Sequence, residues 1–230
     1  MFPLSTDEWL AIELSLRVAF WSVWVSLPFA LFFAWLLARR NFFGKTLVDG
    51  LIHLPLVLPP VVIGYILLVM LGRKGLIGEW LYEALGVSVA FKWEGAAIAS
   101  AVMGFPLMVR AIRLSLETVD QGLEKAARTL RAGPIRVFLT ITLPLISPGI
   151  LTGVVLGFAR SLGEFGATIT FVSNIPGETR TLPLALYTFT QVPGGDAMAM
   201  RLTVIAVVLA LLSLFISEFL ARRIRTRLGG

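Results

Sequence analysis

Two side chains of opposite charge stand four residues apart within the largely apolar segment 157–172. Arg160 and Glu164 would both lie inside a membrane-spanning helix, where an ionisable side chain is costly and marks either a transport pathway or a structural ion pair. On a continuous helix, Ser161 and Thr168 share the face of this pair. We expect this small, polar face to line the bundle interior or a watery cavity, as part of a translocation pathway or gate. The alternative is that Arg160 and Glu164 only lock two helices together.

Other chemistry is sparse in the sequence. The chain has no cysteine, which excludes disulfides, thiolate catalysis and Cys-based metal sites. Its single histidine, His53, stands near Pro55 in an apolar run and is better interpreted as a core or interface residue than as a metal ligand. Glu164 with His53 is a small set of groups for a membrane enzyme. No G-x-x-x-x-G-K-S/T sequence is present, so we expect the chain not to cradle ATP phosphates in that way.

The composition indicates a membrane protein. The 230 residues are 57% hydrophobic and 15% charged, with a mean hydropathy of +0.87, which is more apolar than a soluble domain. Several apolar runs approach the roughly 20 residues that a helix needs to cross a bilayer. We expect an all-α polytopic bundle, with residues 1–230 as one transmembrane domain. The predicted spans are 18–38, 51–72, 95–112, 146–172 and 202–221.

The second predicted span is unusual in its prolines. Pro55, Pro59 and Pro60 leave backbone carbonyls without helical partners, and inside a bilayer only neighbouring helices, side chains or water can satisfy them. We therefore expect this span to face protein or a cavity, with Pro59 and Pro60 as candidate pathway or gate residues.

The basic residues predict an orientation. Lysine and arginine concentrate in one set of alternate loops and in the C-terminal tail, which the positive-inside rule assigns to the cytoplasm. With five spans, the N-terminus then lies outside and the C-terminus inside. This asymmetry explains the basic net charge, so we expect no nucleic-acid partner. The residues on the predicted inner side are Arg39, Arg40, Lys45, Arg110, Arg113, Lys125, Arg128, Arg131, Arg136, Arg222, Arg223, Arg225 and Arg227.

The predicted inner loop at 119–144, called the knob below, has the pattern of two short helices. Asp120 can cap the first helix, along which an apolar stripe recurs at helical spacing. Gly133 and Pro134 would end this helix and start a second one, 135–141. The loop is either a compact docking element or an amphipathic connector on the lipid surface, and the pattern does not separate the two. The stripe consists of Leu123, Ala126 or Ala127, and Leu130.

The knob resembles the EAA loop of ABC importer permeases, whose pattern is Glu-Ala-Ala, three residues, Gly, nine residues and Ile-x-Leu-Pro. The resemblance implies that the knob docks in a cleft of a separate nucleotide-binding ATPase subunit and transmits its closure. The residues that match the pattern are Ala126, Ala127, Ile141, Leu143 and Pro144. The coupling residues implied are these five together with Leu123, Glu124, Lys125, Leu130, Arg131 and Gly133.

Two positions of the knob depart from that pattern. Lys125 stands where the family has glutamate, and Glu124 lies one step earlier, about 100° around a helix. Arg131 stands where the family has glycine. Because a left-handed conformation costs a non-glycine residue about 1 kcal/mol or more, we expect Gly133 to carry the turn.

Three longer stretches are similar to molybdate permease subunits of ABC importers. The resemblance extends over nearly the whole chain, and sulfate permeases share its LPP and LGEFGA elements. The stretches are HLPLVLPPVVIGYILL at 53–68, FPLMVRAIRL at 105–114 and GFARSLGEFGATITFVSNIPGETRTLPLALYTFTQ at 157–191.

That resemblance implies a type I ABC importer permease of the MetI-like kind in the bacterial cytoplasmic (inner) membrane. It would be a homodimer that works by alternating access with two ATPase subunits, which hold the ATP and Mg, while the permease binds no cofactor and is no enzyme. A periplasmic molybdate-binding protein would dock on the outer side, where the segment 179–192 of the external loop 173–201 belongs to the surface that it meets. The implied substrate is molybdate or tungstate. The alternatives are a sulfate/thiosulfate importer and, less favoured, a passive channel, which would not need the knob.

Overall fold

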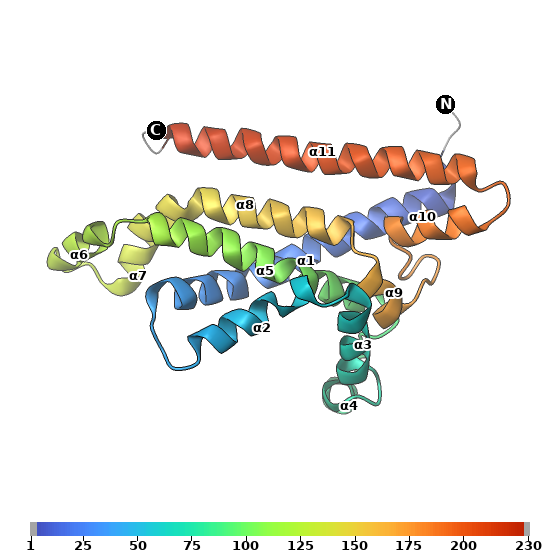
Figure 1. The fold of residues 1–230 in the computed structure, drawn as a ribbon, viewed down its shortest axis with the longest axis horizontal. Helices are drawn as coiled ribbons and strands as arrows, with labels where there is room; N and C mark the ends of the chain where they lie inside the picture. Colours follow the sequence, from blue (N-terminus) through green and yellow to red (C-terminus); the bar gives the residue numbers. More distant parts are fainter. Residues whose placement is uncertain (1–3, 228–230) are drawn as a thin grey trace.

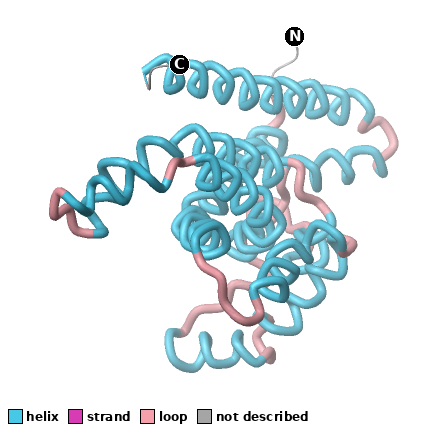
Figure 2. The backbone as a smooth tube through the Cα atoms, turned by 60° about the vertical axis from the view of Figure 1, so that its left-hand side comes forward, coloured by secondary structure: helices cyan, strands magenta, loops and turns pink. Residues whose placement is uncertain are grey.

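The computed structural model describes residues 4–227, and these residues form helices joined by short loops, without a strand (Figures 1 and 2). The all-α prediction is confirmed. The elements are α1 (Thr6–Arg39), α2 (Lys45–Val57), α3 (Pro60–Leu71), α4 (Leu76–Leu85), α5 (Trp93–Thr118), α6 (Gln121–Thr129), α7 (Pro134–Val137), a π-helical turn (Phe138–Thr142), α8 (Leu143–Leu162), α9 (Gly166–Val172), α10 (Leu182–Gln191) and α11 (Asp196–Arg227). The ends of the predicted domain, 1–3 and 228–230, lie outside the described residues.

Three long helices form the centre of the bundle, with α5 packed against both α1 and α8. Met108, Ile112 and Ile146 are buried where these helices meet. The α5 and α8 backbones also approach closely, because a Cβ on Gly104 would lie 3.3 Å from the carbonyl oxygen of Gly157. Small residues permit such contacts in a membrane, where packing rather than the hydrophobic effect joins helices.

The first helix extends well before the predicted span at 18–38. It begins in a capping box, in which the Ser5 hydroxyl accepts the Glu8 N–H and the Glu8 carboxylate accepts the Ser5 N–H. Glu8 is buried and also accepts a hydrogen bond of 2.9 Å from Arg201 Nε of α11. These partners let the helix include a charged residue that the hydropathy pattern excludes.

The number of spans depends on one bent pair. The long apolar helices α1, α5 and α11, and the continuous helix Pro134–Leu162, are each long enough to cross a membrane. The predicted span 51–72 is instead two helices, α2 and α3, bent by 114°. Proline explains the break, because Pro59 and Pro60 offer no backbone N–H to continue α2. Counting the pair as one span gives the five that the sequence predicts.

The fourth predicted span, 146–172, is not one helix. The helix ends at Leu162, the chain turns through Gly163, Glu164 and Phe165, and α9 begins at Gly166. The expectation that Arg160 and Thr168 share one continuous helical face is therefore wrong.

The loop expected to lie outside, 173–201, is largely helical. It contains α10 and the start of α11, which is continuous from Asp196 and thus longer than the predicted 202–221. α10 packs against α1 and α11, and the Leu182 N–H donates to the Ser15 hydroxyl of α1 at 2.6 Å. The first turns of α1 and α11 thus lie at the same end of the bundle, and α6 and α7 lie at the opposite end (Figure 1).

Candidate functional site: the knob and the broken spans

The first knob helix, α6, has the expected cap, because Asp120 Oδ1 accepts the Gly122 N–H at 2.7 Å. Its stripe is only partly covered. Leu123 and Ala126 are exposed, Ala127 is half-buried, and Leu130 is 84% exposed. Leu130 and Ile135, which is 75% exposed, therefore present apolar surface beyond the end of the bundle.

The turn between the knob helices differs from the expectation. Arg131 has φ of 61°, in the left-handed region, whereas Gly133 has φ of −66°. The prediction that Gly133 carries the turn is therefore wrong: Arg131 adopts the left-handed conformation at the family's glycine position. Backbone bonds hold it there, since the Ala132 N–H donates to the Ala127 carbonyl at 3.2 Å.

The second knob helix is not a separate element ending at Ile141. It runs from Pro134 through the π-helical turn directly into α8, so Leu143 and Pro144 lie inside a continuous helix. The Leu143 N–H donates to the carbonyl of Phe138, five residues earlier. Such a widened turn gives room for Pro144, whose ring would crowd the carbonyl four residues before it in a regular α-helix. Ile141 and Leu143 are half-buried, and Pro144 is exposed.

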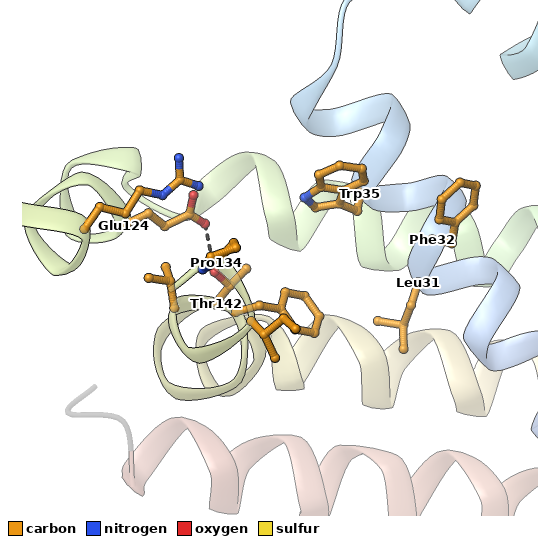
Figure 3. A pocket seen from close by; sticks show the side chains of 10 residues that line it. Leu31, Phe32, Trp35, Glu124, Pro134 and Thr142 are labelled. Atoms are coloured by element: carbon orange, nitrogen blue, oxygen red, sulfur yellow. Dashed lines mark hydrogen bonds between the residues drawn. The ribbon is translucent and has the colours of Figure 1, made fainter. Parts of the chain in front are cut away.

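The charged residues at 124 and 125 point in different directions. Lys125 is exposed. Glu124 turns toward the membrane helices, where its Oε1 accepts hydrogen bonds from Arg39 Nη2 at 3.2 Å and from the Thr142 hydroxyl at 2.8 Å. The Glu124 and Arg39 side chains are only 17% and 11% exposed. Figure 3 shows Glu124 and Thr142 joined at the edge of a cavity.

That cavity has a volume of about 370 Å³ and separates the knob from the second half of α1. Leu31, Phe32 and Trp35 line it from α1, and Pro134 and Thr142 line it from the opposite side (Figure 3). The remaining lining residues are Glu124, Arg128, Ile135, Val137 and Phe138.

The predicted pathway residues of the fourth span lie at its break. Arg160 Nη1 pairs with Glu164 Oε2, and Glu164 Oε1 accepts the Ala167 N–H at 2.8 Å, which caps α9. The Glu164 side chain is 1% exposed and that of Arg160 is 26% exposed. Buried Ser161 shares a hydrogen bond with Ser22 of α1, and the buried Thr168 hydroxyl donates to the Phe165 carbonyl at 2.8 Å. Within this chain, most of the predicted polar face packs inside the bundle.

The two broken spans meet each other. α3 packs on α9, so closely that a Cβ on Gly64 would lie 2.5 Å from the Ala167 carbonyl oxygen. Pro60, at the start of α3, lies beside Gly166, at the start of α9. The structure thus brings Pro60, which follows Pro59 in the chain, to the start of α9 beside the Glu164 turn, and leaves the knob residues at a separate site.

Sequence reasoning missed three contributors to these sites: Arg39, Thr142 and Ser22. Arg39 was used in the sequence prediction only as one of the positive charges that set the orientation. Thr142 occupies the variable position of the Ile-x-Leu-Pro pattern. The sequence did contain a signal for Ser22, because Ser15, Ser22 and Ser26 fall on one helical face. The structure buries all three side chains. Among the described residues, no group of three His, Cys, Asp or Glu side chains could hold a metal ion.

The fold has a counterpart among solved structures. A crystal structure of a bacterial ABC transporter involved in the import of the acidic polysaccharide alginate contains a chain with a TM-score of 0.75 to this one, at 16% identity, over 95% of this chain and 80% of that chain. At this identity the similarity shows the fold alone, which is that of an ABC importer permease.

The chain belongs to the family of binding-protein-dependent transport system inner membrane components, whose model matches residues 26–226. It is 64% identical to the molybdenum transport system permease protein of Escherichia coli K12 over 98% of this chain and 99% of that protein. The protein of the same name from Haemophilus influenzae is 63% identical over 95% and 96% of the two chains. The family resemblance, the ABC importer permease fold and the inner-membrane location are confirmed.

Proposed function

We propose that this chain is the permease of an ATP-driven molybdate importer. The observation that carries the proposal is the identity of 64% to a molybdenum transport permease over almost the full length of both chains. In this alternating-access mechanism, the anion would cross the membrane along a pathway lined by two broken spans, α2–α3 and α8–α9, which contact each other. Helix breaks inside a membrane are tolerated where they are buried in protein or line a water-filled path.

The knob is the proposed docking site of a separate ATPase subunit, which holds the ATP and Mg. Exposed Leu130 and Ile135 supply apolar surface for a cleft, and Lys125, Arg128 and Arg131 make its rim basic. Because α7 is continuous with α8, a movement of the docked knob would act directly on a membrane helix. This end would face the cytoplasm, with the N-terminus outside.

A homodimer with two ATPase subunits is the proposed assembly. No residue of α2 is buried within the described chain, and α3 has an exposed apolar face. These surfaces are available to a second copy or to lipid. A periplasmic binding protein would meet the segment 173–201 at the opposite end, and selectivity would reside mainly in that protein.

Arg160 is the proposed pathway residue of the α8–α9 break. It is the part of the Arg160–Glu164 pair that remains 26% exposed, whereas Glu164 caps α9. A dianion would be attracted by this guanidinium but not bound tightly, because conduction requires that the ion can leave the site.

The test is reconstitution of the permease with its ATPase and binding protein in vesicles. We expect ATP-dependent uptake of molybdate that excess sulfate does not abolish. Sulfate uptake of equal rate would support the sulfate alternative, and uptake without the ATPase would support a channel. If Arg160→Ala leaves molybdate uptake unchanged, Arg160 has no role in the pathway.

A further inference from the structure

Glu124 holds a position that differs from its neighbours in the knob. Lys125 and Arg128 are exposed on α6, whereas the Glu124 side chain is 17% exposed and directed at the membrane helices. Its two partners come from separate elements: Arg39 is the last residue of α1, and Thr142 is the last residue of the π-helical turn that leads into α8. One carboxylate oxygen therefore joins three parts of the chain.

The charges and burial of this junction favour a stable ion pair between Arg39 and Glu124. Arg39 is a cation at the C-terminal end of α1, where the helix dipole stabilises positive charge. A charge-assisted bond from a guanidinium to a carboxylate is stronger than a neutral hydrogen bond. Since both side chains are largely buried, salt screens the pair less than it screens surface pairs.

The surrounding packing makes this polar junction important. α6 packs on α7 and on the π-helical turn, but a cavity of about 370 Å³ separates the knob from Leu31, Phe32 and Trp35 of α1. Apolar side chains do not fill that space, so apolar packing across it does not fix the knob against α1. Glu124 lines this cavity, and its bond to Arg39 joins the knob to the end of α1.

We propose that Glu124 is a positioning residue that ties the knob to α1 through Arg39 and to α8 through Thr142. A movement that the ATPase imposes on the knob then reaches two membrane helices together. The proposal rests on the docking function proposed above, and it gives Glu124 a role inside the permease in place of a contact with the ATPase.

The experiment measures coupling in the reconstituted importer with Glu124→Gln, Arg39→Glu and the charge-swapped double variant Glu124→Arg with Arg39→Glu. We expect each single variant to keep the ATPase subunit bound and hydrolysing ATP, while molybdate uptake per ATP falls at least fivefold. The double variant restores the pair in reverse, so it should recover at least half of the lost uptake. Glu117→Gln is the matched control, because it removes an exposed Arg–Glu pair of α5, with Arg113 Nε 2.8 Å from Glu117 Oε1, and should leave the uptake per ATP unchanged.

A distance measurement tests the junction without transport. The chain has no cysteine, so spin labels can be placed on Gln121→Cys of α6 and Asn41→Cys after α1. We expect Glu124→Gln to broaden the distance distribution between the labels, and Thr142→Val to broaden it less. An unchanged distribution, release of the ATPase by Glu124→Gln, or a double variant no better than the single ones would overturn the proposal.

Leu130→Asp tests the docking function separately. If the ATPase stays bound to that variant, the proposed docking site is wrong. The distances between the labels then still test the Glu124 junction.

Discussion

The hydroxyls of Ser22 in α1 and Ser161 in α8 lie 2.7 Å apart inside the bundle. This bond joins two central helices at the level of the turn that contains Glu164. Interhelical hydrogen bonds in membrane proteins contribute about 0.6 kcal/mol on average and up to about 1.7 kcal/mol. The bond is therefore a modest but specific link.

Replacing either serine by alanine should lower the stability of the permease in detergent by an amount in that range. The Ser22 hydroxyl also donates to the Ala19 carbonyl at 2.9 Å. The double variant Ser22→Ala with Ser161→Ala should therefore cost about as much as Ser22→Ala alone, because the bond between the two serines is already lost in that single variant. Thermal unfolding of the four proteins gives the comparison. Ser213→Ala is the control, since its hydroxyl donates to the Leu209 carbonyl of its own helix. Additive losses would show that the two hydroxyls do not act together.

The contact of α3 with α9 predicts a strict size limit at Gly64. A Cβ at this position would lie 2.5 Å from the Ala167 carbonyl oxygen, so Gly64→Ala must push the two helices apart. Overpacking of this kind typically costs about 1–3 kcal/mol, and we expect a lower melting temperature and a loss of transport. Gly50→Ala in α2 is the matched control, because a Cβ added there would meet no atom of the described chain within 4 Å beyond its own helix turn. Equal behaviour of the two variants would contradict a tight α3–α9 contact.

The sequence predicts those elements that depend on local pattern. The length of the apolar runs predicts the long helices. Asp120 predicts the start of α6, and Gly133 with Pro134 predicts where the next helix begins. Each depends on neighbours in the chain, such as the Gly122 N–H that Asp120 caps. Such contacts can be inferred without knowledge of the tertiary fold.

The features that sequence reasoning missed depend on distant partners. The break after Leu162 lies within a continuous apolar pattern and is stabilised by the Glu164 carboxylate at the start of α9. The inward direction of Glu124 depends on Arg39, which is 85 residues away in the chain. Helical periodicity gives the face of a residue but not the partner that this face meets.

The basic rim of the knob predicts an acidic or carbonyl-rich cleft on the ATPase. The double charge reversal Lys125→Glu with Arg131→Glu should weaken the association of permease and ATPase at least tenfold, because two exposed positive charges become negative. Co-purification at low and high salt measures the effect, which should shrink as salt screens the charges. Lys45→Glu, at the same end of the bundle but outside the knob, should have little effect. Intact assembly and transport in the double variant would show that the basic rim does not contribute.

Arg131 combines two roles that a pair of variants can separate. Its φ of 61° costs a non-glycine residue about 1 kcal/mol or more, so Arg131→Gly should stabilise the turn, whereas Arg131→Gln removes the charge and keeps the backbone cost. The readout is hydrogen exchange of the Ala132 amide, which donates to the Ala127 carbonyl. We expect slower exchange in Arg131→Gly, unchanged exchange in Arg131→Gln, and faster exchange in Ala132→Gly, which only adds chain freedom. If both Arg131 variants bind the ATPase more weakly, the charge explains the loss. If Arg131→Gly exchanges as fast as the unaltered chain, the left-handed turn is not strained.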